Sequence, residues 1–143
     1  MCGIFGIIGK DNLNKKNLNI LANHALQRGQ DSSGVIYSDH EKLNIIKSDK
    51  KINNLIKNIK YADPEMFLGH SRLITNSISE NQPIFRDDII VLHNGIVTNY
   101  QQVWNNLDIQ PKFEIDSEIL IGIALDSLKK GLTISDIPKR IFS

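Results

Sequence analysis

The chain has 143 residues, 41% hydrophobic and 23% charged, which is typical of one globular domain with a buried core. Its 17 Lys and Arg residues against 16 Asp and Glu residues leave a net charge of +1, which argues against nucleic acid as a partner. No apolar run approaches the roughly 20 residues that span a bilayer, so we expect no membrane partner and a cytoplasmic protein. The single cysteine, Cys2, excludes an internal disulfide and a cysteine metal cluster.

The first half of the chain predicts short strands alternating with helices. Apolar and β-branched residues between glycines indicate a buried strand that begins directly after Cys2. Helical spacing of leucines and alanines, followed by a glycine, indicates the first helix. In chain order we expect a strand over 3–9, a helix over 18–26, a hairpin of strands over 35–38 and 43–47, and a helix over 52–59 that ends before Pro64.

The second half predicts two further strands and then helices. The expected elements are strands over 66–72 and 89–93 around a polar loop over 75–82, a helix over 97–107 with Trp104 packed, a helix from an Asp116 N-cap to about 130, and a last helix capped by Ser135. We find no repeat and no Gly, Ser or Pro-rich linker. The sequence therefore predicts a single domain over 1–143.

Cys2 stands where a thiol can become an N-terminal nucleophile. A small second residue permits removal of Met1, after which the thiol and a free α-amine belong to the same residue. The amine can then accept the thiol proton without a histidine. The alternative is that Cys2 is a small buried hydrophobe, as most lone cysteines are, and its position alone favours that interpretation.

The interpretation of Cys2 depends on six segments of the chain, which are MCGIFGIIG, QRGQDSSG from 27, GHSRLITNS from 69, QP at 82, HNGIVTNY from 93 and DSE from 116. In order and in spacing they resemble the class II glutamine amidotransferase domain, which favours the nucleophile. That resemblance covers nearly the whole chain and implies hydrolysis of the glutamine side-chain amide to glutamate and ammonia. The fold it implies is α+β, a four-layer αββα sandwich of the N-terminal-nucleophile hydrolase type.

The resemblance assigns catalytic roles to four residues. Cys2 is similar to the nucleophile that forms a γ-glutamyl thioester, with its own α-amine as the base. Asn94 and Gly95 match the oxyanion hole, which needs two neutral donors aimed at the charge that develops on the amide oxygen. Arg28 resembles the arginine that braces the nucleophile loop. By itself Asn-Gly would be read as a turn after a strand.

The resemblance also implies a site for free L-glutamine as the substrate. Arg72 would hold the glutamine carboxylate, since a guanidinium can donate two parallel hydrogen bonds, and Asp116 would pair with its ammonium group. Thr75 would add a hydroxyl contact. Leu73 stands where the family often has an aromatic lid residue. We expect no metal and no cofactor, because no His, Asp or Glu set shows ligand spacing, and Asp87 and Asp88 are interpreted as solvated turn residues.

Two histidines that could suggest a catalytic triad receive structural roles. In the family the histidine that His70 resembles is not the base, and a lone histidine at the end of a strand is more often a satisfied core group. His93, beside the Asn-Gly pair, is interpreted in the same way.

The family domain continues beyond the position of Ser143, so we expect the C-terminal part of the domain and an acceptor (synthase) domain to follow. The motif HNGI resembles the glucosamine-6-phosphate synthase branch and predicts a sugar phosphate acceptor, whereas RGQDS and DSEIL resemble the phosphoribosylpyrophosphate amidotransferase branch equally well. With Met1 in place the chain is expected to be inactive. A non-catalytic fragment that binds glutamine or docks a partner, an N-terminal-cysteine amidase for other amides, and a homo-oligomer remain open.

Overall fold

A computed structural model describes residues 2–9, 13–40, 42–60, 64–73 and 81–142. They form two compact units, which we treat separately. Unit 1 comprises Met1–Pro83 and Leu92–Gly95, and unit 2 comprises Ile84–Val91 and Ile96–Ser143. The loop expected over 75–82 lies mostly outside the described residues, as does Thr75.

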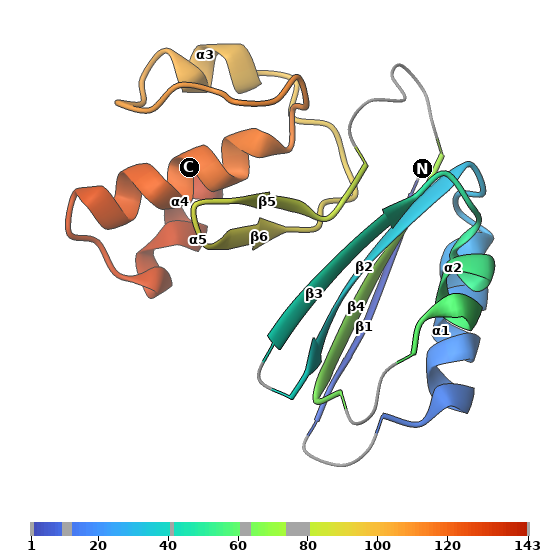
Figure 1. Ribbon diagram of the computed structural model, residues 1–143. Coiled ribbons are helices and arrows are strands. Elements are labelled where there is room, and N and C mark those ends of the chain that lie inside the picture. Colours follow the sequence, from blue (N-terminus) through green and yellow to red (C-terminus); the bar gives the residue numbers. More distant parts are fainter. Residues whose placement is uncertain (1, 10–12, 41, 61–63, 74–80, 143) are drawn as a thin grey trace. The chain divides into compact units, whose positions relative to one another are not determined.

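Unit 1 is built on an antiparallel sheet of four strands in the order β1-β4-β2-β3 (Figure 1). Cys2 directly precedes the first strand, as predicted, and Gly3 lies opposite Ser71. The predicted hairpin is confirmed, because β2 and β3 pair antiparallel from Ser33 opposite Ser48 to Asp39 opposite Lys42. The bounds are β1 (Gly3–Ile8), β2 (Ser32–Asp39), β3 (Lys42–Ser48) and β4 (Met66–Arg72).

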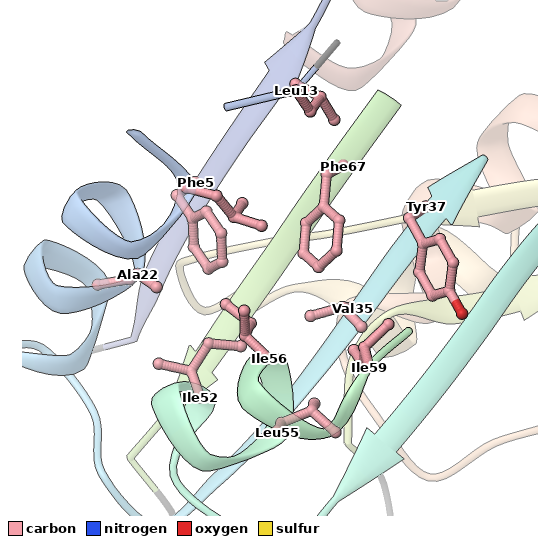
Figure 2. Close-up of a cluster of buried hydrophobic side chains, with 12 residues drawn as sticks. Phe5, Leu13, Ala22, Val35, Tyr37, Ile52, Leu55, Ile56, Ile59 and Phe67 are labelled. Carbon is pink, nitrogen blue, oxygen red and sulfur yellow. The ribbon is translucent and has the colours of Figure 1, made fainter. Parts of the chain in front are cut away.

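Two helices cover one face of this sheet, α1 (Lys15–Leu26) and α2 (Ile52–Asn58), and both agree with the sequence prediction (Figure 1). Alternate residues of the strands point toward them, because side chains alternate between the faces of a sheet. Figure 2 shows the resulting core, in which the strand residues Phe5, Val35 and Phe67 face the helices. Tyr37 stacks on Phe67 across β2 and β4, with 5.6 Å between the ring centroids.

Unit 2 consists of a short hairpin and helices. Strands β5 (Ile84–Arg86) and β6 (Ile89–Val91) pair antiparallel. Asp87 and Asp88 form the two-residue turn, both at positive φ, which fits the predicted turn role. The helices are α3 (Tyr100–Trp104), α4 (Glu118–Lys129), a 3-10 turn (Ile134–Asp136) and α5 (Ile137–Phe142), and their core contains Trp104, Leu107, Ile119 and Ile123.

Several element predictions in unit 2 were wrong. The helix expected over 97–107 is reduced to α3, and β5 was missed because three residues are too few for a visible alternation. Ser135 does not cap the last helix. Thr133 caps the preceding 3-10 turn, in a capping box with Asp136, whose carboxylate accepts bonds from the Thr133 backbone and hydroxyl.

None of the described helices combines the length and the apolar character that crossing a bilayer requires.

Candidate active site

The backbone nitrogen of Cys2 donates a hydrogen bond to Oδ1 of Asn94 at 3.2 Å. The two residues are 92 positions apart in the sequence, and unit 1 contains both of them. Because an N–H group can only donate, the amide oxygen of Asn94 must face Cys2, which leaves its Nδ2 group directed elsewhere. The contact therefore joins the predicted nucleophile to a predicted oxyanion donor.

A pocket of about 390 Å³ opens beside these two residues. It lies between the start of β1 and the last turns of α1, and the thiol residue is half-buried at its wall. Three of the four predicted catalytic residues, Cys2, Arg28 and Asn94, line this pocket together with Ile4, Leu21 and His24. The fourth, Gly95, follows Asn94 and is exposed.

The loop after α1 is attached to the end of β4. The amide of Asp31 donates to the Arg72 carbonyl at 2.9 Å, and the Ser71 hydroxyl donates to the Gly29 carbonyl at 2.6 Å. Only glycine fits at position 29, because a Cβ atom there would overlap the backbone between Ser71 and Leu73. The loop that carries Arg28 is thereby placed beside the strand end that carries Arg72.

The predicted substrate residues occupy different surroundings. Arg72 is half-buried at the end of β4, on the same face of the sheet as His70, since the two are separated by one residue. Leu73 follows it and is 41% exposed, so its side chain is available to a ligand. Thr75 falls outside the described residues and its role stays a prediction.

Asp116 belongs to unit 2, where its Oδ2 atom accepts a hydrogen bond from the Val97 backbone at 2.7 Å. The prediction that it caps α4 was wrong, because Ser117 is the N-cap residue and makes no side-chain cap bond. The carboxylate instead holds the segment that follows Gly95. The next acidic residue, Glu118, is fully buried and binds Arg86 at 2.6 Å, a pairing that the sequence did not reveal.

His70 is fully buried, and its pKa is lowered to about 4. Burial disfavours the charged imidazolium, and the nearby Arg72 charge adds to this effect, while the backbone of His93 acts in the opposite direction. The ring is therefore neutral at neutral pH. Within the described ranges, His, Cys, Asp and Glu side chains form no group of three that could hold a metal ion.

Comparison with known proteins gives related sequences of two kinds. A glutamine–fructose-6-phosphate aminotransferase of Wigglesworthia glossinidia brevipalpis is 34% identical over 99% of the chain, and an amidophosphoribosyltransferase of Pseudomonas aeruginosa is 30% identical over all of it. The chain spans 25% and 31% of the length of these relatives. No protein-family model matches the chain.

Comparison with solved structures also gives related proteins. The glutamine phosphoribosylpyrophosphate amidotransferase of Bacillus subtilis matches 97% of the chain with a TM-score of 0.73 and 27% identity, and the chain spans 32% of that structure. An allosteric regulatory enzyme of purine biosynthesis matches with a TM-score of 0.74 and 26% identity. These likenesses confirm the predicted α+β fold class of the N-terminal-nucleophile hydrolases. Within that class, the chain belongs to the class II glutamine amidotransferases.

Proposed function

We propose that this chain is the glutaminase domain of a glutamine-dependent amidotransferase, which hydrolyses the side-chain amide of L-glutamine to glutamate and ammonia. The observation that carries the proposal is the contact between the Cys2 nitrogen and the Asn94 side chain beside an open pocket. That nitrogen becomes a free α-amine once Met1 is removed. Nucleophile, base and oxyanion donor then come from residues that are already in contact.

The reaction uses Cys2 twice. Its α-amine takes the thiol proton, and the sulfur attacks the amide carbon of glutamine to give a tetrahedral intermediate. The negative charge on the oxygen is stabilised by Asn94 Nδ2 and the Gly95 N–H group. The C–N bond then breaks as the ammonium form of the α-amine returns the proton to the leaving ammonia. Water hydrolyses the resulting thioester and releases glutamate.

Recognition of free glutamine is assigned to the residues that the family resemblance names for it. Arg72 binds the substrate carboxylate, with Thr75 adding a hydroxyl, and Asp116 binds the ammonium group. Its contact with Val97 supports the role of Asp116, because a carboxylate already fixed by a backbone bond loses little freedom when it meets a cation. Leu73 excludes water, and Arg28 braces the loop beside Cys2.

The ammonia serves an acceptor domain of the longer protein. We propose a sugar phosphate as the acceptor, supported by the resemblance to glutamine–fructose-6-phosphate aminotransferases. Phosphoribosylpyrophosphate is the second candidate, because the structural matches with TM-scores of 0.73 and 0.74 include a phosphoribosylpyrophosphate amidotransferase. The reducing cytoplasm suits a reaction that depends on a free thiol.

The test compares two forms of the full-length protein, one with Met1 removed and one with Met1 retained. We expect the processed form to release ammonia from glutamine, and an electrophilic glutamine analogue to label Cys2 in that form alone, as read by mass spectrometry. Cys2→Ala should abolish both signals. A processed, folded protein that binds glutamine without releasing ammonia would instead support the non-catalytic alternative, and labelling that persists in Cys2→Ala would remove the nucleophile assignment.

A further inference from the structure

Gln82 makes a contact that the reaction above does not use. Its side-chain Oε1 accepts a hydrogen bond from the His93 backbone at 2.6 Å, and the residue is 6% exposed. His93 directly precedes the Asn94–Gly95 pair. We propose that Gln82 is a positioning residue, whose amide oxygen fixes the backbone of His93 and so aims the two oxyanion donors at the carbonyl that Cys2 attacks. This inference rests on the proposed function.

Gln82 is itself held by its neighbour Asn81. The Asn81 Nδ2 group donates to the Ser33 carbonyl at 2.6 Å and to the Ser48 carbonyl at 3.1 Å, and its Oδ1 accepts from the Gln82 backbone at 2.9 Å. Both ends of the Asn81 amide are therefore engaged. Ser33 and Ser48 lie opposite each other on β2 and β3, so Gln82 is tied to the central sheet rather than to a free loop.

Gly34 of β2 leaves the space that the backbone of Gln82 occupies. A Cβ atom on Gly34 would overlap the Gln82 carbonyl, so only glycine allows the chain to approach β2 this closely. Gly34 lies opposite His70 on β4, and the His93 backbone lies near the His70 ring. Beside them, the Gln82 side chain accepts the hydrogen bond from the His93 nitrogen.

This placement matters because oxyanion donors act through their geometry. A displacement of about 1 Å at a reacting group can lower a rate by roughly a hundredfold, even when its cause lies outside the chemistry. The Asn94 side chain is held at its amide oxygen by Cys2 and at its Cα atom by the backbone. The direction of its Nδ2 group therefore depends on where that backbone lies. Loss of the Gln82 contact frees that backbone on the side of His93 while leaving the thiol unchanged.

The experiment uses the full-length protein with Met1 removed and compares wild type with Gln82→Met, which keeps the length of the side chain and removes the strong acceptor. Two reactions are measured on each. Glutamine hydrolysis needs the oxyanion donors, whereas alkylation of Cys2 by iodoacetamide needs the thiolate but forms no oxyanion. We expect kcat for hydrolysis to fall by about 10 to 100-fold, with KM and the alkylation rate within about twofold of wild type.

The matched control is Ser38→Ala. Ser38 Oγ also accepts bonds from backbone nitrogens, those of Glu65 at 3.1 Å and Met66 at 3.0 Å, but at the opposite end of β2 from Gly34. We expect its kcat to stay within about twofold of wild type, because the oxyanion donors keep their place. If Gln82→Met fails to fold by circular dichroism, Gln82→Asn, one methylene shorter, makes the same test.

Three outcomes would overturn the inference: an unchanged kcat, a change confined to KM, or a parallel fall of hydrolysis and alkylation, which would indicate damage to the nucleophile itself. Failure of the proposed function is distinguished from these, since the processed wild type would then release no ammonia. If the wild type and Gln82→Met are both fully active, the proposed function stands and only the positioning role of Gln82 is contradicted.

Discussion

Unit 1 and unit 2 bury different kinds of polar side chains. The buried polar residues described in unit 1 are all uncharged at neutral pH, namely Ser32, Ser33, His70, Ser71 and Gln82. Those of unit 2 include Arg86, Glu118 and Asp126, all of which form ion pairs. The described polar side chains buried in the unit with the proposed nucleophile are therefore neutral, whereas those of the other unit include ion-paired charges.

The difference has a chemical reason in the proposed reaction. Negative charge develops on the amide oxygen of the substrate beside Cys2, and neutral donors stabilise it. In unit 2 the buried charges hold backbone segments in place. Glu118 accepts bonds from Arg86 and from the backbone nitrogens of Lys112 and Phe113, which anchors the segment leading to Asp116. The two units should therefore respond differently when a charge is removed or the pH is changed.

The largest effect is expected from Arg86→Met, which leaves Glu118 buried without its cation. We expect a loss of about 3 to 5 kcal/mol in the free energy of unfolding, the usual cost of breaking a buried ion pair from one side. Trp104, the single tryptophan, lies in the core of unit 2 and reports the transition by its fluorescence in urea.

Asp87→Asn is the matched control, because it removes the exposed partner of the same arginine and keeps a residue that tolerates positive φ. Its unfolding midpoint in urea should move far less than that of Arg86→Met. Similar shifts for both variants would contradict the view that the buried half of the network stabilises unit 2.

His70 provides the second test, and it acts through pH. The unfolded chain binds a proton below about pH 6.5, while the folded chain does so only near pH 4, so the free energy of unfolding falls as the pH drops through this window. The shift corresponds to about 3 kcal/mol between the two limits. His70→Gln should remove that part of the slope when urea unfolding is followed by circular dichroism from pH 7 to pH 4. Identical slopes in both proteins would contradict a neutral, buried His70.

Asp126 gives a smaller effect in unit 2. Burial acts to raise the pKa of this carboxyl, but hydrogen bonds from Lys130 and Arg140 outweigh it and hold the pKa below its ordinary value. Asp126→Asn should cost about 1.5 to 3 kcal/mol of unfolding free energy at pH 7, the range for hydrogen bonds to a charged group. In wild type this contribution is present above about pH 4 and is lost as the pH falls through the lowered pKa.

Trp104 fluorescence in urea measures the cost of Asp126→Asn as well. The control is Asp108→Asn, which removes the exposed carboxylate that lies 3.8 Å from Lys130 and should leave the midpoint almost unchanged. A larger shift of the unfolding midpoint for Asp108→Asn than for Asp126→Asn would contradict the view that the buried Asp126 carboxylate stabilises unit 2.

The smallest effect is expected from a neutral bond in unit 1. Ser71→Ala removes the buried hydrogen bond to the Gly29 carbonyl and should cost about 1 kcal/mol in urea unfolding followed by circular dichroism. A loss as large as that of Arg86→Met would mean that the neutral and the charged unit do not differ in the way their buried polar groups stabilise them.

The sequence by itself determined the elements of unit 1 and the membership of the family. The apolar start of β4 and the helical spacing in α1 are local patterns, so residues 66–72 and 18–26 were predicted from their own neighbours. Motifs likewise keep their spacing in the chain, which is why the residues of the proposed site could be named before any geometry was known.

Only the tertiary structure decided which of these residues meet. Cys2 contacts Asn94 across 92 positions, Gln82 reaches His93, and Arg86 pairs with Glu118 across 32 positions. The prediction that Asp116 caps a helix failed for the same reason, since a helix cap is a local expectation, whereas the bond from Val97 to Asp116 depends on how distant segments fold together. Side-chain contacts between distant segments follow from packing of the whole core, and no periodicity along the chain records them.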